Sequence, residues 1–282
     1  MVAAAPRNEP HVGKRLSEGT FTVDDAVLES HYAGLGLTPE PGIAVPSTVV
    51  SKPDNDYILE AGFPNRFGHL WVRQGWEFYR PLEAGATYRV RAEIRDIYPR
   101  RDRNVVHFET LLLDRRGALA ARSQHHQSFL KAAAASGEVA LRDPNEKPGA
   151  HRFEVPAGER FGGLERRITV VMCGTFFHGK ANYHTDLEAS KALGFENIVV
   201  GGRMTMAYAA HVLEERFGAA WTAGGHLDVK FTNPVWVDDV VTVNGVLTGP
   251  RSGAPERTGA FVWATRTDGT VVLVGEASVV GG

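Results

Sequence analysis

Two stretches of the chain repeat the same landmarks at a nearly constant distance, and this repetition limits the folds open to the whole sequence. Pro81 lies in an aromatic-rich segment that is followed by a turn and an alternating strand, and Pro234 lies in the same setting 153 residues later. Gly117 marks a turn between two strands, and Gly269 does the same 152 residues downstream. Landmarks at a fixed offset indicate a duplicated unit, so we expect two similar halves.

A segment rich in small, charged and proline residues separates these halves. It runs from Ala132 to about Gly158 and contains three prolines. This composition is typical of a linker. We therefore predict a first domain over residues 11–131, a linker over 132–160 and a second domain over 161–282.

Alternating residues predict antiparallel strands in both halves. From Tyr88 to Arg95, apolar and charged side chains alternate with the period of two of a half-buried strand. We expect the two halves to begin with different elements. The first begins with a helix near Asp24 to Leu35, capped by Asp24 or Thr22, whereas the second begins with the apolar stretch from Ile168 to Phe177.

A helix is predicted from Gly202 to a C-terminal cap at Gly218. Between Met204 and Leu213 this helix is apolar on nearly every side, so it must be enclosed by other parts of the fold. A long buried helix followed by about four antiparallel strands fits a sheet curled around a helix. We therefore predict an α+β double hot-dog fold, with two antiparallel sheets that each curl around a helix.

The second half resembles the hydratase segment of MaoC-like proteins, a family that includes R-specific enoyl-CoA hydratases and 3-hydroxyacyl dehydratases. Asn182, His184 and Asp186 match the Asn, His and Asp of the family pattern, Gly202 matches the glycine that opens the central helix, and residues 231–235 match the strand F-x-x-P-V.

This resemblance covers residues 168–250. The first half resembles, more loosely, the degenerate N-terminal hot dog of two-domain members.

The sequence departs from the family at one point. The spacing from Gly179 to His184 is one residue shorter than the family spacing, and no aspartate precedes Asn182. In the family, that aspartate and the histidine together position and deprotonate water. Three substitutes are open: His184 works alone with Asn182 as orienter, Asp186 turns inward, or a carboxylate enters from elsewhere in the fold. We favour the first substitute, because Asp186 stands where a helix N-cap is expected.

The resemblance implies a hydro-lyase that acts on an acyl thioester, carried by coenzyme A or by an acyl carrier protein. Histidine suits both proton transfers of such a reaction near neutral pH, which makes His184 the catalytic candidate. The backbone amide of Gly202, at a helix N-terminus, could stabilise the enolate-like oxygen. Isomerisation or cyclisation of a biosynthetic intermediate, or a non-catalytic acyl-binding subunit, are the alternatives.

Residues beside this pair are candidates for substrate binding. Tyr183 either lines the pocket or packs in the core. Lys180 is favoured as a solvated loop charge, with a contact to substrate as the alternative. Arg203 opposes the helix dipole from its N-terminal position and therefore invites an anionic partner.

For the other reactive residues we expect structural roles. Cys173 lies in a hydrophobic run and is expected to be a core residue. His125 and His126 are adjacent on a predicted strand, so they should point to opposite faces and not share a metal. His211 is expected to be a core or interface residue. The sequence contains none of the common metal, nucleotide or nicotinamide motifs, so we predict no metal and no cofactor.

The composition limits the kinds of binding partner and the location that we expect for this protein. The 31 basic and 33 acidic residues give a net charge of −2, which does not indicate a nucleic-acid partner. No run of eighteen apolar residues predicts a membrane span, and the first ten residues do not resemble a signal peptide. A single cysteine is ordinary for a cytoplasmic protein. We expect a homodimer or a pseudo-dimeric monomer.

Overall fold

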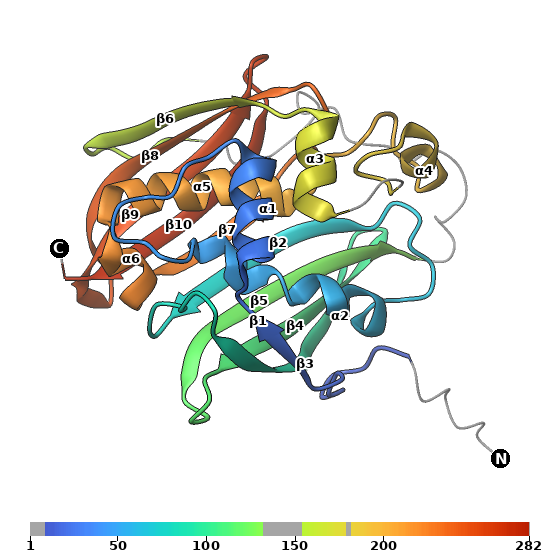
Figure 1. Cartoon of the computed structure of the whole chain (residues 1–282). Helices are drawn as coiled ribbons and strands as arrows, with labels where there is room; N and C mark the ends of the chain where they lie inside the picture. The colour runs from blue at the N-terminus through green and yellow to red at the C-terminus, as the bar shows by residue number, and fades with distance from the viewer. Residues whose placement is uncertain (1–8, 132–153, 179–181, 282) are drawn as a thin grey trace.

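Ten antiparallel strands form one continuous, curved sheet in this computed structural model, which describes residues 9–131, 154–178 and 182–281 (Figure 1). The strand order is β1-β3-β4-β5-β2-β7-β10-β9-β8-β6. The first five strands belong to the first half of the chain and the last five to the second half. Matching β1 with β6, β3 with β8, β4 with β9, β5 with β10 and β2 with β7 makes the order symmetric about the β2–β7 pair.

The strands and helices of the first half are β1 (Gly19–Thr22), α1 (Asp25–Leu35), the 3-10 helix η1 (Ser47–Ser51), α2 (Asp54–Ala61), β2 (Leu70–Phe78), β3 (Thr87–Arg100), β4 (Arg103–Leu113) and β5 (Leu119–Leu130). Those of the second half are β6 (Arg160–Arg167), α3 (Val170–Phe177), α4 (Leu187–Ala192), α5 (Gly202–Phe217), α6 (Ala219–Gly224), β7 (His226–Phe231), β8 (Val240–Arg251), β9 (Ala254–Arg266) and β10 (Val271–Val280).

The α+β double hot-dog prediction is confirmed, with one refinement. The two predicted sheets are joined edge to edge into one, because β2 and β7 pair antiparallel, with Gln74 opposite Val229 and Trp76 opposite Leu227. This pairing satisfies one exposed sheet edge of each half within a single chain. The predicted domain limits remain a prediction, since residues 132–153 of the linker lie outside the described residues.

The expectation that the halves open differently is wrong. Both begin with a short strand followed by a helix, β1–α1 in the first half and β6–α3 in the second. The strand β6 could not be predicted from the sequence, because Gly162, Gly163 and four charged residues give it no alternation of apolar and polar side chains. The segment from Ile168 to Phe177 contains α3, which the Thr169 side chain caps by accepting from the Met172 N–H.

The repeated landmarks lie at equivalent places in the two halves. Gly117 and Gly269 turn the β4–β5 and β9–β10 connections with φ angles of 79° and 80°, in the left-handed region that favours glycine. Pro81 and Pro234 follow β2 and β7 and lie outside both strands. A proline has no N–H for the sheet, which explains why each stands after its strand.

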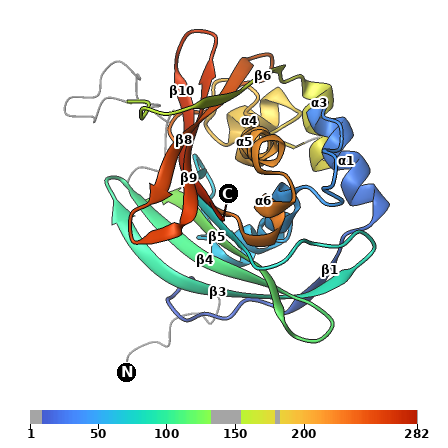
Figure 2. The same ribbon diagram turned by 90° about the vertical axis from the view of Figure 1, so that its left-hand side faces the viewer.

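Helix α5 is the centre of the fold, and the sheet curls around it (Figure 2). All its residues from Arg203 to Glu214 are buried, and Gly218 ends it with its N–H bonded to the Glu214 carbonyl. These observations confirm the predicted helix and its cap. Over residues 9–131, the first half holds only the eight-residue α2 against its own cluster of apolar residues on β3, β4 and β5. This part of the chain therefore contains no long central helix.

Helices α1 and α3 pack side by side and cover the open side of the curled sheet (Figures 1 and 2). Asp24 caps α1 as predicted, because its carboxylate accepts from the Val27 N–H at 2.9 Å. At the crossing point a Cβ on Gly34 would lie 2.7 Å from the Cβ of Phe176, so only glycine allows the two helices to approach this closely. No helix in the described ranges is long and apolar enough to cross a membrane.

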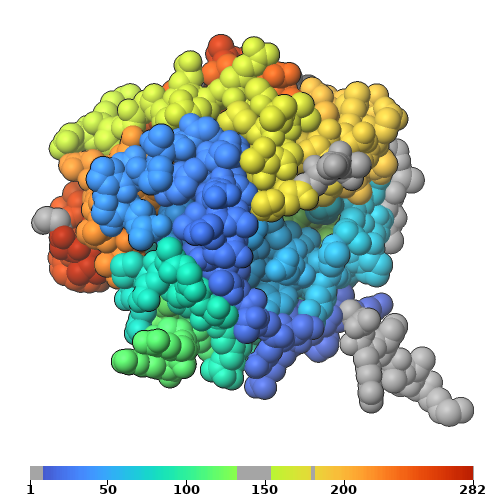
Figure 3. Space-filling view, viewed as in Figure 1, coloured from blue at the N-terminus to red at the C-terminus, as the bar shows by residue number. Residues whose placement is uncertain are grey.

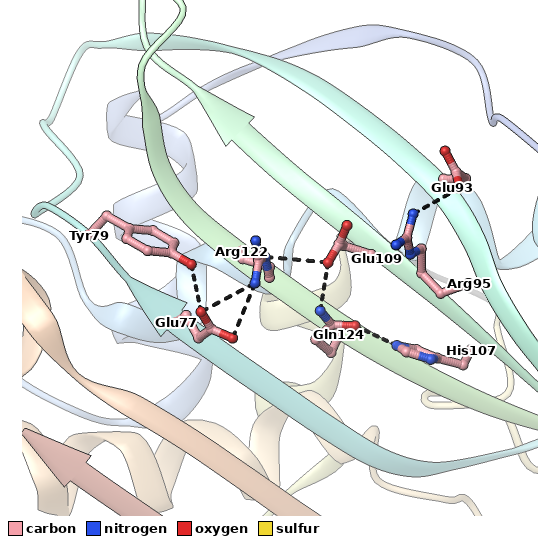
Figure 4. A network of polar contacts seen from close by, with 8 residues as sticks. All are labelled: Glu77, Tyr79, Glu93, Arg95, His107, Glu109, Arg122 and Gln124. Carbon is pink, nitrogen blue, oxygen red and sulfur yellow. Dashed lines mark hydrogen bonds and ion pairs between the residues drawn. The ribbon is translucent and has the colours of Figure 1, made fainter. Parts of the chain in front are cut away.

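The face of the sheet that is turned away from the helices carries a ladder of polar contacts across β2, β5 and β4 (Figure 4). The Tyr79 hydroxyl donates to Glu77, Arg122 lies between Glu77 and Glu109, and Gln124 bonds Glu109. Gln124 also contacts His107. Partly exposed pairs of this kind contribute little to stability, and they explain why alternate residues of these strands are polar.

A buried carboxylate ties α5 to the first half. Glu214 is 4% exposed, and one of its oxygens accepts from both the backbone N–H and the hydroxyl of Ser47 at 2.6 Å. The Trp221 indole N–H donates in turn to the Ser47 hydroxyl at 2.9 Å. A buried charge requires such partners, so this joint fixes η1 against α5.

We predict that Glu214→Ala lowers the free energy of unfolding by about 2–3 kcal/mol, because it leaves the buried Ser47 donors unsatisfied. The neighbouring variant Glu215→Ala is the control, since that side chain is 46% exposed and should change stability by less than about 0.5 kcal/mol. Urea unfolding of the two variants checks this. Equal stabilities would contradict the role assigned to the joint.

Candidate functional site

The loop that carries His184 is a tight turn built around Asn182. The Asn182 side-chain oxygen accepts from the backbone N–H of His184 at 2.8 Å, and its backbone carbonyl accepts from Thr185 and Asp186, both at 2.8 Å. Asn182 therefore orients the backbone that carries His184. Its side-chain oxygen thus acts on the backbone of the turn, and the predicted role of Asn182 as orienter of the imidazole or of water stays a prediction.

The imidazole of His184 is held by a separate contact. Its Nδ1 lies 2.7 Å from the carbonyl oxygen of Val199, and a carbonyl can only accept, so Nδ1 carries the proton. The ring stacks on Phe177, with the centroids 4.3 Å apart, and tilts against Tyr183 at 4.0 Å. This arrangement leaves Nε2 with a free lone pair, as a general base requires.

Burial lowers the pKa of His184 to about 4, and the positive charge of Arg203 and the nearby His69 add to this effect. The bond to the Val199 carbonyl acts in the opposite direction but is the smaller influence. The ring is consequently neutral at physiological pH. Because its conjugate acid is strong, a proton taken up by Nε2 would be returned readily.

The N-terminus of α5 lies beside this ring. A Cβ on Gly201 would lie 3.2 Å from Cε1 of His184 and 2.1 Å from Phe177, so only glycine fits there. No side chain caps the first turn of α5, which leaves backbone N–H groups at Gly202 facing outward from the helix end. The His184 ring therefore lies beside Gly201 at the start of α5, and the predicted role of the Gly202 amide stays a prediction.

The first half contributes the facing wall of the site. Trp71, on β2, stacks on His125 at 4.6 Å and contacts Phe231 of β7 at 5.2 Å. A Cβ on Gly202 would lie 3.2 Å from the rings of both Trp71 and Phe231. The β2–β7 pair thus sets two aromatic rings against the helix start, and the glycine makes room for them.

A second histidine, His69, was missed by the sequence analysis. Its Nδ1 lies 2.6 Å from the Arg66 carbonyl, and its ring meets Tyr183 edge-on at 5.5 Å. Burial lowers its pKa. No local motif surrounds it, and only the pairing of the two halves brings it to the loop of His184.

Arg203 is buried beside the site, with 5% of its surface exposed. Its guanidinium carbon lies 4.7 Å from the ring centre of Phe176 and 5.4 Å from that of Phe177. Phe177 therefore contacts both His184 and Arg203. Lys180, the other predicted cation, lies outside the described residues.

Several structural interpretations of the sequence are confirmed. Asp186 caps α4 by accepting from the Ala189 N–H at 2.7 Å, so it does not turn toward His184. Tyr183 packs with a small apolar cluster that includes Trp236, and its role in lining the substrate pocket stays a prediction. Burial raises the pKa of the Cys173 thiol to about 12, as expected of a core cysteine.

The remaining histidines also lie at the positions predicted for them from the sequence. His125 faces the interior against Trp71 and Phe108, whereas His126 lies on the opposite face, stacked on His107 at 4.0 Å. His211 lies at the interface of the halves. Its Nε2 is 3.5 Å from a carboxylate oxygen of Glu40 and 3.9 Å from one of Glu215. One possible ligand atom from each of these three residues lies within 4.8 Å of the other two, as in a metal site.

We predict that His184 stays neutral between pH 8 and pH 5. Its pKa is lowered, so protonation begins only as the pH falls toward about 4, below the ordinary value of 6.5. Nitrogen-15 NMR of the imidazoles, with His184→Gln to assign the signal, measures this. The internal reference is His211, whose pKa the neighbouring glutamates raise. Titration of His184 near pH 6.5 would contradict the buried, Nδ1-protonated ring.

Comparison with known proteins agrees with this architecture. Residues 178–263 match the family model described as MaoC like domain, a range that begins just before the His184 loop and includes α5. No curated protein matches the chain in sequence.

Solved structures match nearly the whole chain. A protein described as a MaoC-like dehydratase superposes with a TM-score of 0.75 at 16% identity, over 96% of this chain and 98% of its own. A MaoC-like dehydratase from Phytophthora capsici gives 0.69 at 19% identity, over 98% and 97%. A Mycobacterium tuberculosis protein with a double hot-dog fold gives 0.63 at 14% identity, over 96% of each chain. At such identities the likeness establishes the fold.

Proposed function

Because the chain contains a MaoC-like dehydratase domain within a double hot-dog fold, we propose that it is a hydro-lyase that adds water to, or removes it from, an acyl thioester. The observation that carries this proposal is the meeting of two groups at one place. The His184 ring, whose Nε2 carries the lone pair, lies beside Gly201 at the uncapped N-terminus of α5, one residue before Gly202. A base beside an oxyanion donor is what hydration of a conjugated thioester needs.

In the hydration direction, Nε2 of His184 takes a proton from water as the water oxygen bonds to C3 of the enoyl group. The electron pair of the C2–C3 double bond moves to the thioester, where the oxygen gains negative charge. The Gly202 N–H and the dipole of α5 stabilise that charge. The imidazolium then returns its proton to C2, so one histidine serves both transfers and all atoms balance.

The structure favours His184 acting without a carboxylate partner. Asp186 is engaged as the cap of α4, and among the described residues no carboxylate bonds to the imidazole. The Val199 carbonyl takes the place that such a partner would occupy by fixing the Nδ1 tautomer. Burial makes the imidazolium a strong acid, which suits the return of the proton to carbon.

The same observation supports a second candidate. A site with one base and no local carboxylate also suits isomerisation, in which His184 moves a proton between two carbons of the acyl group and no water is added. Product analysis by mass spectrometry separates the two, because hydration adds the mass of one water and isomerisation adds none. A non-catalytic acyl-binding subunit would bind the thioester without turnover.

The acyl group is carried by coenzyme A or by an acyl carrier protein, in the cytoplasm. The pairing of β2 with β7 joins two hot dogs in one chain and supplies both walls of the site. A pseudo-dimeric monomer is therefore sufficient for function, and a homodimer of such chains would carry two sites.

We predict that His184→Gln lowers kcat for hydration of a short enoyl-CoA by at least about 100-fold, because a glutamine cannot transfer the proton. The decay of the conjugated thioester absorbance measures the rate. Asp186→Asn is the matched control, since asparagine also caps helices and should leave kcat within about twofold. Unchanged turnover by His184→Gln would remove the histidine from the mechanism.

A further inference from the structure

Arg203 buries a guanidinium that no protein group neutralises at contact distance. Its Nε and Nη1 are both buried without a hydrogen bond. Within the ranges that the structure describes, no carboxylate approaches it to ion-pairing distance, and its neighbours are the rings of Phe176 and Phe177. An unpaired buried charge is costly, and most such groups have partners. The arginine therefore points to a ligand.

A small pocket, with about 20 Å³ of free volume, lies beside Arg203 and opens to solvent. It is formed where α1 and η1 of the first half meet α3 and the start of α5, on the face seen in Figure 3. Its lining consists of Val27, Ser30, His31, Thr48, Val49, Lys52, Phe176 and Arg203. Polar and cationic groups thus share the pocket with apolar side chains.

The charge within the pocket lining is positive. Burial lowers the pKa of Arg203 to about 10, so it stays charged near neutral pH, and Lys52 is a second cation. His31 is neutral, because burial lowers its pKa to about 3.

Three carboxylates lie in the surroundings of the pocket and outside its lining. Asp54 and Asp56 attract Arg203 from a distance, and Asp24 and Asp56 act likewise on Lys52. Oδ2 of Asp54 accepts from Gln74 and Ser123, whereas its Oδ1 is buried without a hydrogen bond, and Asp24 caps α1. The lining itself contains two cations and no carboxylate, which suits an anion.

The chemistry of the lining favours a carboxylate on a carbon chain. A guanidinium binds the planar carboxylate well, and the adjacent ammonium adds charge. Val27, Val49 and Phe176 offer apolar surface that a free inorganic anion would not use, whereas methylene groups would.

The pocket adjoins the proposed catalytic groups. Phe177 contacts the His184 ring at 4.3 Å between centroids and the Arg203 guanidinium carbon at 5.4 Å. Arg203 also directly follows Gly202, whose amide faces the thioester oxygen in the proposed reaction. A short acyl chain held at Gly202 would thus need to extend only along the first turn of α5 to reach Arg203.

We propose that this pocket binds a carboxylate at the far end of the acyl chain, an inference that rests on the proposed function. The preferred substrates are then thioesters of dicarboxylic acids. Arg203 is the specificity-determining residue, with Lys52 as the second cation. The reaction at C2 and C3 is unchanged by this assignment.

The test compares two substrates that differ at the chain end. Glutaconyl-CoA carries a carboxylate where 2-pentenoyl-CoA carries a methyl group. We expect kcat/KM to be at least tenfold higher for glutaconyl-CoA, and Arg203→Met to reduce this ratio to near one. Arg203→Lys keeps the charge without the planar fork and should give an intermediate ratio.

Arg216→Met is the matched control. Arg216 lies at the other end of α5, in an ion pair with Glu159, and its loss should leave the ratio as in the wild type. Thermal unfolding shows whether each variant is folded. Removal of an unpaired buried cation should not lower the Tm of Arg203→Met.

Ligand binding is measured separately from turnover, as the rise in Tm caused by glutarate or by inorganic phosphate. The proposal expects glutarate to raise the Tm of the wild type and of Arg216→Met, but not of Arg203→Met. Glutarate binding that depends on Arg203, in a protein that turns over no thioester, would support the pocket and refute the proposed function. Turnover of both substrates at equal kcat/KM would overturn the proposal and leave the hydro-lyase intact. Stabilisation by phosphate alone would also overturn it, because the pocket would then serve a free anion.

Discussion

The antiparallel pairing of β2 with β7 is the contact on which the rest of the structure depends. It joins two five-stranded halves into one sheet, satisfies an edge of each, and closes a wall around α5. Among the described residues α5 is the one long central helix, so the first half serves the second as a partner would in a dimer. The pairing also sets Trp71 of β2 and Phe231 of β7 together against Gly202. The candidate site thus depends on the pairing of β2 with β7, although its reactive groups come from the second half.

Much of this architecture was predictable from the sequence. The offsets between Pro81 and Pro234 and between Gly117 and Gly269 follow from the matching order of the strands, and the all-apolar surface of α5 required an enclosing sheet. Strand β6 was not predicted, because its charged and glycine residues carry no alternation. Edge pairing of the two sheets within one chain was expected as one of two possibilities, beside a homodimer, but the strands that pair were not predicted, since edge pairing depends on backbone groups, which leave no pattern in the side chains.

The site was predictable in part, for a related reason. His184, Asn182 and Gly202 lie in one short stretch, and the turn and helix start that join them are local structures. His69 and Trp71 come from the other half, and no local motif marks them. The burial that lowers the pKa of His184 likewise arises from packing between distant segments. The sequence showed that an aspartate was missing, and the structure shows the Val199 carbonyl fixing the ring in its absence.

In the proposed function, His184, the start of α5 and the wall supplied by the first half form one thioester site. A crystal structure with a non-reactive enoyl-thioester analogue is the direct test. We predict the thioester oxygen within hydrogen-bond distance of the Gly202 N–H, C3 facing Nε2 of His184, and the acyl chain directed toward Arg203. An analogue bound elsewhere, or one whose C3 lies away from His184, would contradict it.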